Sequence, residues 1–378
     1  MTLPIQFPPP FPIQEYRSRL AALRSFMAER KVDLLIVNQH EHMEYFAGYA
    51  PTAAMYQAIL IPLDGEPVAV IRALDASVFS ETSWLTDYVA FADNEDPIEV
   101  ASNTIVSLGH GGSAIGVERD SYFFTINRAV AFEGFLPNVR FVDFSAILWL
   151  MRQVKSPLEL ACLQVAAGIC DRATMVGFEA AEAGVSEREV LAVMISEALR
   201  NGADNAQLVQ LVCGPRSGSL HGALGNRILA EGDIVHAEPV PHFRGYTSRM
   251  MRPKSIGAPT DEQMLIAEAT IRVQDEQFRA MKPGAEAKEV DKILREGMLS
   301  AGLRDRYTNV TGYTLGLKHP PRTSDFTRVF LADSDWRLLE NQVFHMYTGA
   351  GGMAFSETIV VTPEGGRRLT KMERRLFS

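Results

Sequence analysis

The chain has 378 residues, which is too long for one ordinary hydrophobic core and fits two domains. Hydrophobic residues make up 47% of the chain and charged residues 22%, which is the balance of a soluble globular protein. The formal net charge of -9 argues against nucleic acid or an anionic membrane as the main partner.

The sequence also favours a reducing, cytoplasmic location. Residues 1–12 are proline-rich and lack the basic segment and apolar run of a signal peptide. No uncharged stretch reaches the roughly 18 residues that span a membrane. Cys162, Cys170 and Cys213 form no CxxC pair and no metal-type spacing. We therefore interpret them as small buried apolar residues of a cytoplasmic protein.

The first part of the chain has the pattern of an α/β domain, over residues 1–150. Residues 13–30 form an amphipathic pattern that predicts a helix. His40, His42 and His110 are expected in loops. Short apolar runs predict strands at residues 32–37, 58–62, 67–71, 115–117 and 139–142.

The second part, residues 151–378, contains helix pairs followed by strands. Helix starts are marked by Ser156 with Glu159, by Ser186 with Glu189 and by Thr260 with Gln263, each a capping-box pattern, and a further helix starts near Ala287. Strand-like runs lie at residues 208–212, 233–236, 343–347 and 356–362. Two helix pairs, each followed by strands, indicate an internal duplication and an α+β fold.

His221, Glu238 and Glu357 are the candidate catalytic residues from local sequence. His221 lies in a glycine-rich loop directly after an apolar run, where catalytic residues collect, and a histidine there can exchange a proton near neutral pH. Glu238 and Glu357 lie on predicted strands. Together the three residues could supply a general acid or base and a nucleophilic or cation-stabilising carboxylate.

Motifs along the second part carry a family resemblance. They are Arg152-Gln-Val-Lys155-Ser156-Pro157-Leu-Glu159, Cys213-Gly-Pro-Arg-Ser with Leu220-His221-Gly222, Leu229-Ala-Glu-Gly232-Asp233, Gly245-Tyr246-Thr-Ser248, Thr311-Gly312-Tyr313-Thr-Leu-Gly316 and Phe355-Ser-Glu357-Thr. In order and spacing they resemble the creatinase, prolidase and aminopeptidase P superfamily, the M24-like proteins. The resemblance implies a creatinase-like N-terminal α/β domain and a duplicated pita-bread catalytic domain.

The metallopeptidases of this superfamily hold two divalent ions with two Asp, one His and two Glu. The corresponding positions here are Glu238, Arg249, Tyr313, Tyr347 and Glu357. A guanidinium has no lone pair to give to a metal. The resemblance therefore implies that the metal site is lost, and we expect neither a metal nor another cofactor.

The non-metal members of the superfamily, creatinase and the ectoine hydrolases, offer a different set of roles. In stretches such as Phe344-His345-Met346 and Gly312-Tyr313-Thr-Leu-Gly316-Leu followed by Pro320-Pro321, the chain looks closer to the ectoine hydrolases than to creatinase. By that resemblance Glu238 attacks an amidine carbon, His221 shuttles the proton, and Glu357 binds the amidine cation. Tyr313, Tyr347 and His319 would bind substrate.

Two questions stay open at this point. Arg249 could clamp a substrate carboxylate or pair with Glu238. Residues 322–326 and 348–354 also depart from the ectoine hydrolases, and Met251 departs from creatinase. The substrate could therefore be another small amidine, guanidine or cyclic amide.

We expect a metal-independent hydrolase of a small C–N compound. The alternatives are an Xaa-Pro peptidase with an unusual site and a catalytically inactive binding protein. Retention of His221 and Glu357 argues against the inactive protein. The resemblance further implies a homodimer, in which residues 49–56 of one chain could reach the substrate of the other.

Overall fold

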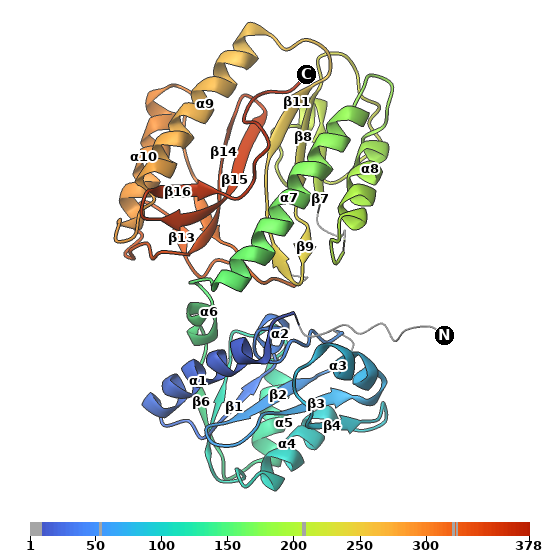
Figure 1. The fold of residues 1–378 in the computed structure, drawn as a ribbon, viewed down its shortest axis with the longest axis vertical. Helices are drawn as coiled ribbons and strands as arrows, with labels where there is room; N and C mark the ends of the chain where they lie inside the picture. The colour runs from blue at the N-terminus through green and yellow to red at the C-terminus, as the bar shows by residue number, and fades with distance from the viewer. Residues whose placement is uncertain (1–9, 53–54, 206–208, 320–321, 323) are drawn as a thin grey trace. The chain divides into compact units, whose positions relative to one another are not determined.

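The computed structural model describes residues 10–52, 55–205, 209–319, 322 and 324–378. Contacts between Cα atoms divide the chain into two compact units, Met1–Met151 and Arg152–Ser378 (Figure 1). Residue 208 of a predicted strand, and residues 320–321 of the Pro-Pro motif, lie outside the described residues.

The first unit is a mixed six-stranded sheet with helices, in the strand order β4-β3-β2-β1-β5-β6. Its elements are α1 (Ile13–Glu29), β1 (Leu34–Val37), α2 (His40–Ala47), β2 (Ala58–Pro62), β3 (Val68–Arg72), a 3₁₀ turn (Ala73–Asp75), α3 (Ala76–Thr82), β4 (Tyr88–Phe91), α4 (Pro97–Ser107), β5 (Ala114–Val117), α5 (Ile126–Phe135), β6 (Arg140–Asp143) and α6 (Ile147–Met151). Strand β1 pairs antiparallel with β2 and parallel with β5. The predicted α/β architecture of this unit is confirmed.

One prediction for this unit is wrong. His40 and His42 are buried on helix α2, not in loops. His42 Nδ1 lies 2.5 Å from a carboxylate oxygen of Glu118, which is also buried. Almost every position of α2 is buried, polar residues included. The sequence of this helix therefore lacks the amphipathic period that predicts a helix.

In the described residues of the second unit, four long helices pack on two main sheets, in the strand orders β11-β8-β7 and β13-β12-β14-β15-β16. Its elements are α7 (Pro157–Ala180), α8 (Glu187–Arg200), β7 (Val209–Cys213), a 3₁₀ turn (Gly214–Arg216), β8 (Ile234–Pro239), β9 (His242–Phe243), β10 (Tyr246–Thr247), β11 (Arg252–Ser255), α9 (Asp261–Ala280), α10 (Ala287–Ser300), β12 (Gly312–Thr314), β13 (Val329–Phe330), β14 (Val343–Ala350), β15 (Met353–Thr362) and β16 (Gly365–Arg368). A bridge from Met251 to Ser356 joins the two sheets.

The helix pairs repeat, as the sequence indicates. The predicted capping boxes of α7, α8 and α9 are all formed. The loops that enter the second helix of each pair turn at Gly184 and Gly284, whose φ angles of 92° and 85° suit glycine. The fourth helix begins at Ala287 as predicted, and α7 ends at Ala180, a few residues before the predicted end.

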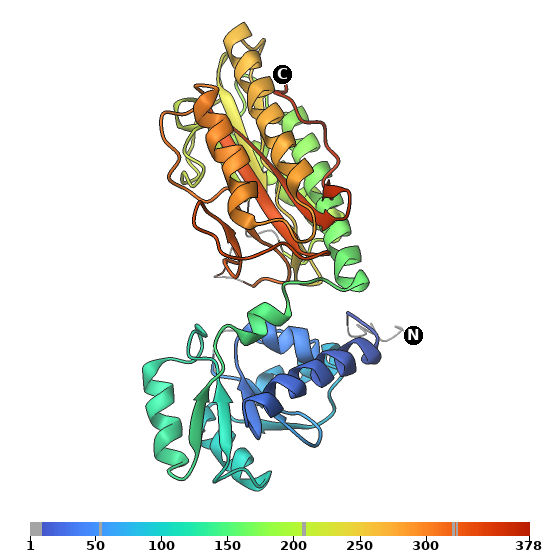
Figure 2. The same ribbon diagram turned by 90° about the vertical axis from the view of Figure 1, so that its left-hand side faces the viewer.

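The long helices cover the sheets and leave the other face for the site. Figure 2 shows α7, α9 and α10 lying side by side along the strands of this unit. Within the described chain, α7 is also the one helix long and apolar enough to cross a membrane, and half of that apolar window is buried in the fold. It packs against α8 and β8, as a core helix does.

Candidate functional site

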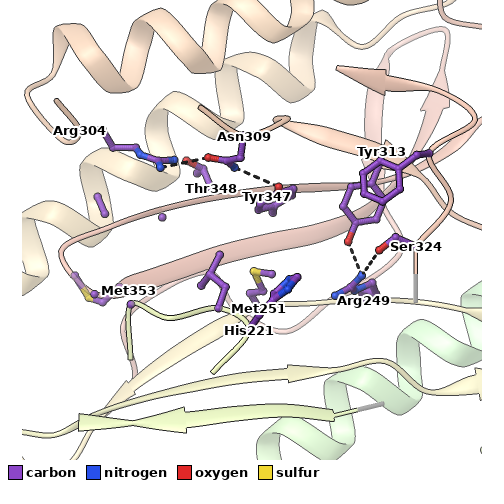
Figure 3. Close-up of a pocket in the computed structure, with 16 residues that line it drawn as sticks. His221, Arg249, Met251, Arg304, Asn309, Tyr313, Ser324, Tyr347, Thr348 and Met353 are labelled. Carbon is purple, nitrogen blue, oxygen red and sulfur yellow. Dashed lines mark hydrogen bonds between the residues drawn. The ribbon is translucent and has the colours of Figure 1, made fainter. Parts of the chain in front are cut away.

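The second unit contains a pocket of about 400 Å³ that the two sheets and their loops enclose. His221 reaches it from the loop after β7, and Arg249 reaches it from the segment between β10 and β11 (Figure 3). Tyr313 and Tyr347 enter from the adjacent strands β12 and β14. The order of the strands thus brings together residues that are far apart in the sequence.

A buried ion pair forms one end of the site. Arg249 Nε lies 2.9 Å from Glu238 Oε1, and its Nη2 lies 2.5 Å from the same oxygen. Glu238 Oε2 is buried and has no hydrogen-bond partner among the described residues. Burial raises the pKa of Glu238, and the charge of Arg249 opposes that rise. Of the two roles open for Arg249, the structure shows the pairing with Glu238.

The other N–H groups of Arg249 also donate hydrogen bonds to residues of the protein itself. Its Nη1 donates to the hydroxyl of Tyr313 and, at 2.9 Å, to Ser324 Oγ (Figure 3). A guanidinium has five N–H groups, and most of those of Arg249 are therefore used by Glu238, Tyr313 and Ser324. Arg249 acts here as an internal cation that fixes the carboxylate and the phenol.

His345 is a member of this network that the local sequence reasoning missed. It lies on β14, fully buried, with Nδ1 2.8 Å from the Tyr313 hydroxyl and Nε2 2.7 Å from Ser356 Oγ. Burial lowers its pKa well below the usual value, so the ring is neutral. The Tyr313 hydroxyl therefore accepts a hydrogen bond from Arg249 and shares a second one with His345 Nδ1. The only sequence signal was the Phe344-His345-Met346 stretch.

Tyr347 is held differently from Tyr313. Its hydroxyl accepts a hydrogen bond from Asn309 Nδ2 at 3.2 Å, which leaves the phenol hydrogen available to the pocket. Its ring stacks on His345 with 5.3 Å between centroids. Burial raises the pKa of Tyr347, so the phenol stays protonated. Neither Asn309 nor its neighbour Arg304, which also lines the pocket, carried a sequence signal.

The structure corrects the expected role of Glu357. This side chain is fully buried and is not among the residues that line the pocket. Its Oε1 lies 2.6 Å from Arg252, 3.2 Å from Arg374 and 3.4 Å from Arg368. Its Oε2 accepts a hydrogen bond from Thr370. Both oxygens are occupied by the protein's own donors, so they cannot receive a substrate cation in this arrangement.

The other predicted residues are also placed. His221 and Met251 line the pocket, whereas Glu238 lies behind Arg249 and is not on the pocket wall. His319 is half-buried and does not line the pocket, which does not fit the expected role in substrate binding. Burial lowers the pKa of His242 to about 3, and the nearby His319 adds to that effect.

The residues present do not fit a pair of divalent metal ions. The guanidinium of Arg249 lies between the Glu238 carboxylate and the Tyr313 phenol, where it donates to both. Glu357 is neutralised by arginines. Within the part of the chain that the structure describes, no group of three or more His, Cys, Asp or Glu side chains could hold a metal ion. The donor set offers hydrogen-bond donors where a metal needs lone pairs.

Buried neutral histidines near the site predict a loss of stability in mild acid. Burial lowers the pKa of His236 to about 4, and His221 adds to that effect. The unfolded chain therefore binds a proton that the folded chain does not, between pH about 6.5 and about 4. We expect the unfolding free energy, measured by urea titration, to decrease as the pH is lowered through this window. For this histidine the decrease is at most about 1.4 kcal/mol per pH unit.

Two matched variants test whether His236 is the group that causes this pH dependence. His236→Gln should reduce the slope of unfolding free energy against pH, whereas His110→Gln, at a partly exposed position, should leave it unchanged. An unchanged slope in His236→Gln would show that His236 is not the group that titrates.

Comparisons with known proteins agree on the family and differ on the activity. The family model "Metallopeptidase family M24" matches residues 161–363, and the "Creatinase/Prolidase N-terminal domain" matches residues 19–154. The chain is 27% identical to an Xaa-Pro dipeptidase of Pyrococcus furiosus, over 96% of this chain and 100% of that protein. It is 26% identical to an ectoine hydrolase of Halomonas elongata, over 99% of each chain.

A solved structure agrees in fold. The prolidase from Pyrococcus horikoshii OT3 superposes with a TM-score of 0.82 at 24% identity, over 95% of this chain and 99% of that chain. The structural likeness confirms the predicted fold class, and the two family models confirm the superfamily. The identities to the peptidase and to the ectoine hydrolase are too similar to choose between two activities.

Proposed function

Because the chain belongs to metallopeptidase family M24 and is a hydrolase of that family, we propose that it hydrolyses a C–N bond of a small non-peptide compound without a metal ion. The observation that carries the proposal is the guanidinium of Arg249, bound to Glu238 and Tyr313. A permanent cation at this position repels divalent ions and orients a carboxylate and a phenol. A cyclic amidine or a related guanidine or amide is the substrate class.

His221, which lines the pocket, would carry the proton transfers of the reaction. It takes a proton from the water that adds to the electrophilic carbon, and it gives that proton to the leaving nitrogen as the C–N bond breaks. Glu238, which is buried behind Arg249, would hold the guanidinium in place and would not attack the substrate itself.

The two tyrosines would take unequal parts. The hydroxyl of Tyr347 accepts from Asn309, so its own hydrogen can stabilise negative charge that develops on the substrate. The hydroxyl of Tyr313 accepts from Arg249 and also bonds to His345, so Tyr313 would hold Arg249 in place. This division follows from the donors that surround each phenol.

The test is turnover by metal-free protein. Protein treated with a chelator and analysed for metal is offered ectoine, creatine, small cyclic amides and Xaa-Pro dipeptides. We expect hydrolysis of a non-peptide compound that is unchanged, within about twofold, by added manganese or cobalt. The Xaa-Pro dipeptidase relative supports a second candidate, which requires manganese- or cobalt-dependent cleavage of a dipeptide and would replace this proposal.

A further inference from the structure

The charge of the pocket is unbalanced. The described residues that line it include Arg249, Arg304 and His221 and include no Asp or Glu. The charge of Arg249 is neutralised by Glu238 behind it. The structure places no carboxylate within 4.0 Å of Arg304 among the residues it describes. One full positive charge therefore faces the pocket without a counterion from the described chain.

Arg304 is also held in a fixed orientation. Its guanidinium lies over the ring of Tyr307, with 4.1 Å to the centroid, and Tyr307 is hydrogen-bonded to Thr348. Its Nη2 donates to Asn309 Oδ1 at 3.3 Å. The side chain is half-buried. Stacking and one hydrogen bond thus orient the guanidinium, and its other donors are left for a ligand.

The geometry points to Arg304 as the binding site for a substrate carboxylate. This inference deepens the proposed function and rests on it for the identity of the pocket. A guanidinium binds a carboxylate through two parallel N–H···O bonds. A single uncompensated charge matches a monoanion better than a phosphate dianion. The described pocket wall offers no carboxylate that could bind the amidinium end of a substrate. The wall can therefore recognise the anionic group of the substrate.

The subsite is connected to the reacting end of the pocket. Figure 3 shows Arg304 at one end and Arg249 with Ser324 at the other. Between them Asn309 accepts from Arg304 and donates to Tyr347. A carboxylate on Arg304 would therefore fix the position of the scissile C–N bond relative to Tyr347, so Arg304 determines specificity.

Equilibrium binding tests this inference separately from turnover. Calorimetry on the full-length protein uses matched pairs of probes: ectoine and its carboxamide, glycylproline and glycylprolinamide, and N-acetylglycine and its amide. We expect at least one carboxylate to bind about 10- to 100-fold more tightly than its amide. Arg304→Gln should remove that preference and leave the affinity for the amide unchanged. Arg304→Lys, which keeps the charge without the planar fork, should give an intermediate preference.

The controls separate folding from recognition. Arg306→Gln, at an exposed position two residues away, should keep the carboxylate preference, and circular dichroism should show that all variants are folded. A preference that survives in Arg304→Gln, or the absence of any carboxylate preference in the natural protein, would overturn the inference. If the natural protein shows an Arg304-dependent preference but hydrolyses nothing, the subsite stands and the proposed function fails.

Discussion

Glu357→Gln is expected to lower the free energy of unfolding by about 3–5 kcal/mol, because it leaves a buried arginine without its carboxylate. Arg252 and Glu357 are both fully buried, with 2.6 Å between Nη2 and Oε1. The amide can accept one hydrogen bond from Arg252 and cannot balance its charge. Urea unfolding followed by circular dichroism measures the loss.

The same variant separates the two roles considered for Glu357. Glu364→Gln, at an exposed position of the next turn, should change the unfolding free energy by less than about 0.5 kcal/mol. If Glu357→Gln keeps its stability and loses most of its kcat, Glu357 takes part in the reaction, as the family resemblance implied. Loss of stability at both positions would indicate a general effect of removing charge.

His221→Ala is expected to lower kcat by about 10²- to 10⁴-fold on the compound that the natural protein hydrolyses, because the proton transfers lose their donor and acceptor. His221 is exposed on a loop at the pocket. Removing it creates no core cavity, so the unfolding free energy should change by less than about 0.5 kcal/mol. Steady-state kinetics and urea unfolding check the two parts of this expectation.

A second histidine provides the comparison. His110→Ala, on a turn of the first unit, should keep the natural kcat. Substrate binding by His221→Ala should persist, because the expected binding groups are Arg304 and Tyr347. A kcat of His221→Ala within about threefold of the natural value would exclude His221 as the proton shuttle.

Local sequence chemistry predicted the helices of the second unit well. Ser156, Ser186 and Thr260 each form the capping box that the residue three positions later completes. Such signals act over one turn of helix and need no tertiary contact. Helix α2 was missed because burial on all its sides removes the amphipathic period.

By itself the sequence predicted the family and the paired-helix architecture, and it singled out Arg249, Tyr313 and Tyr347 at motif positions, because side-chain chemistry at such positions does not depend on packing. Only the tertiary structure decided how charge is shared. It pairs Arg249 with Glu238, surrounds Glu357 with arginines from β11, β16 and the C-terminal segment, and leaves Arg304 facing the pocket. Electrostatic partners are set by distance in space, and strands far apart in the chain create those distances.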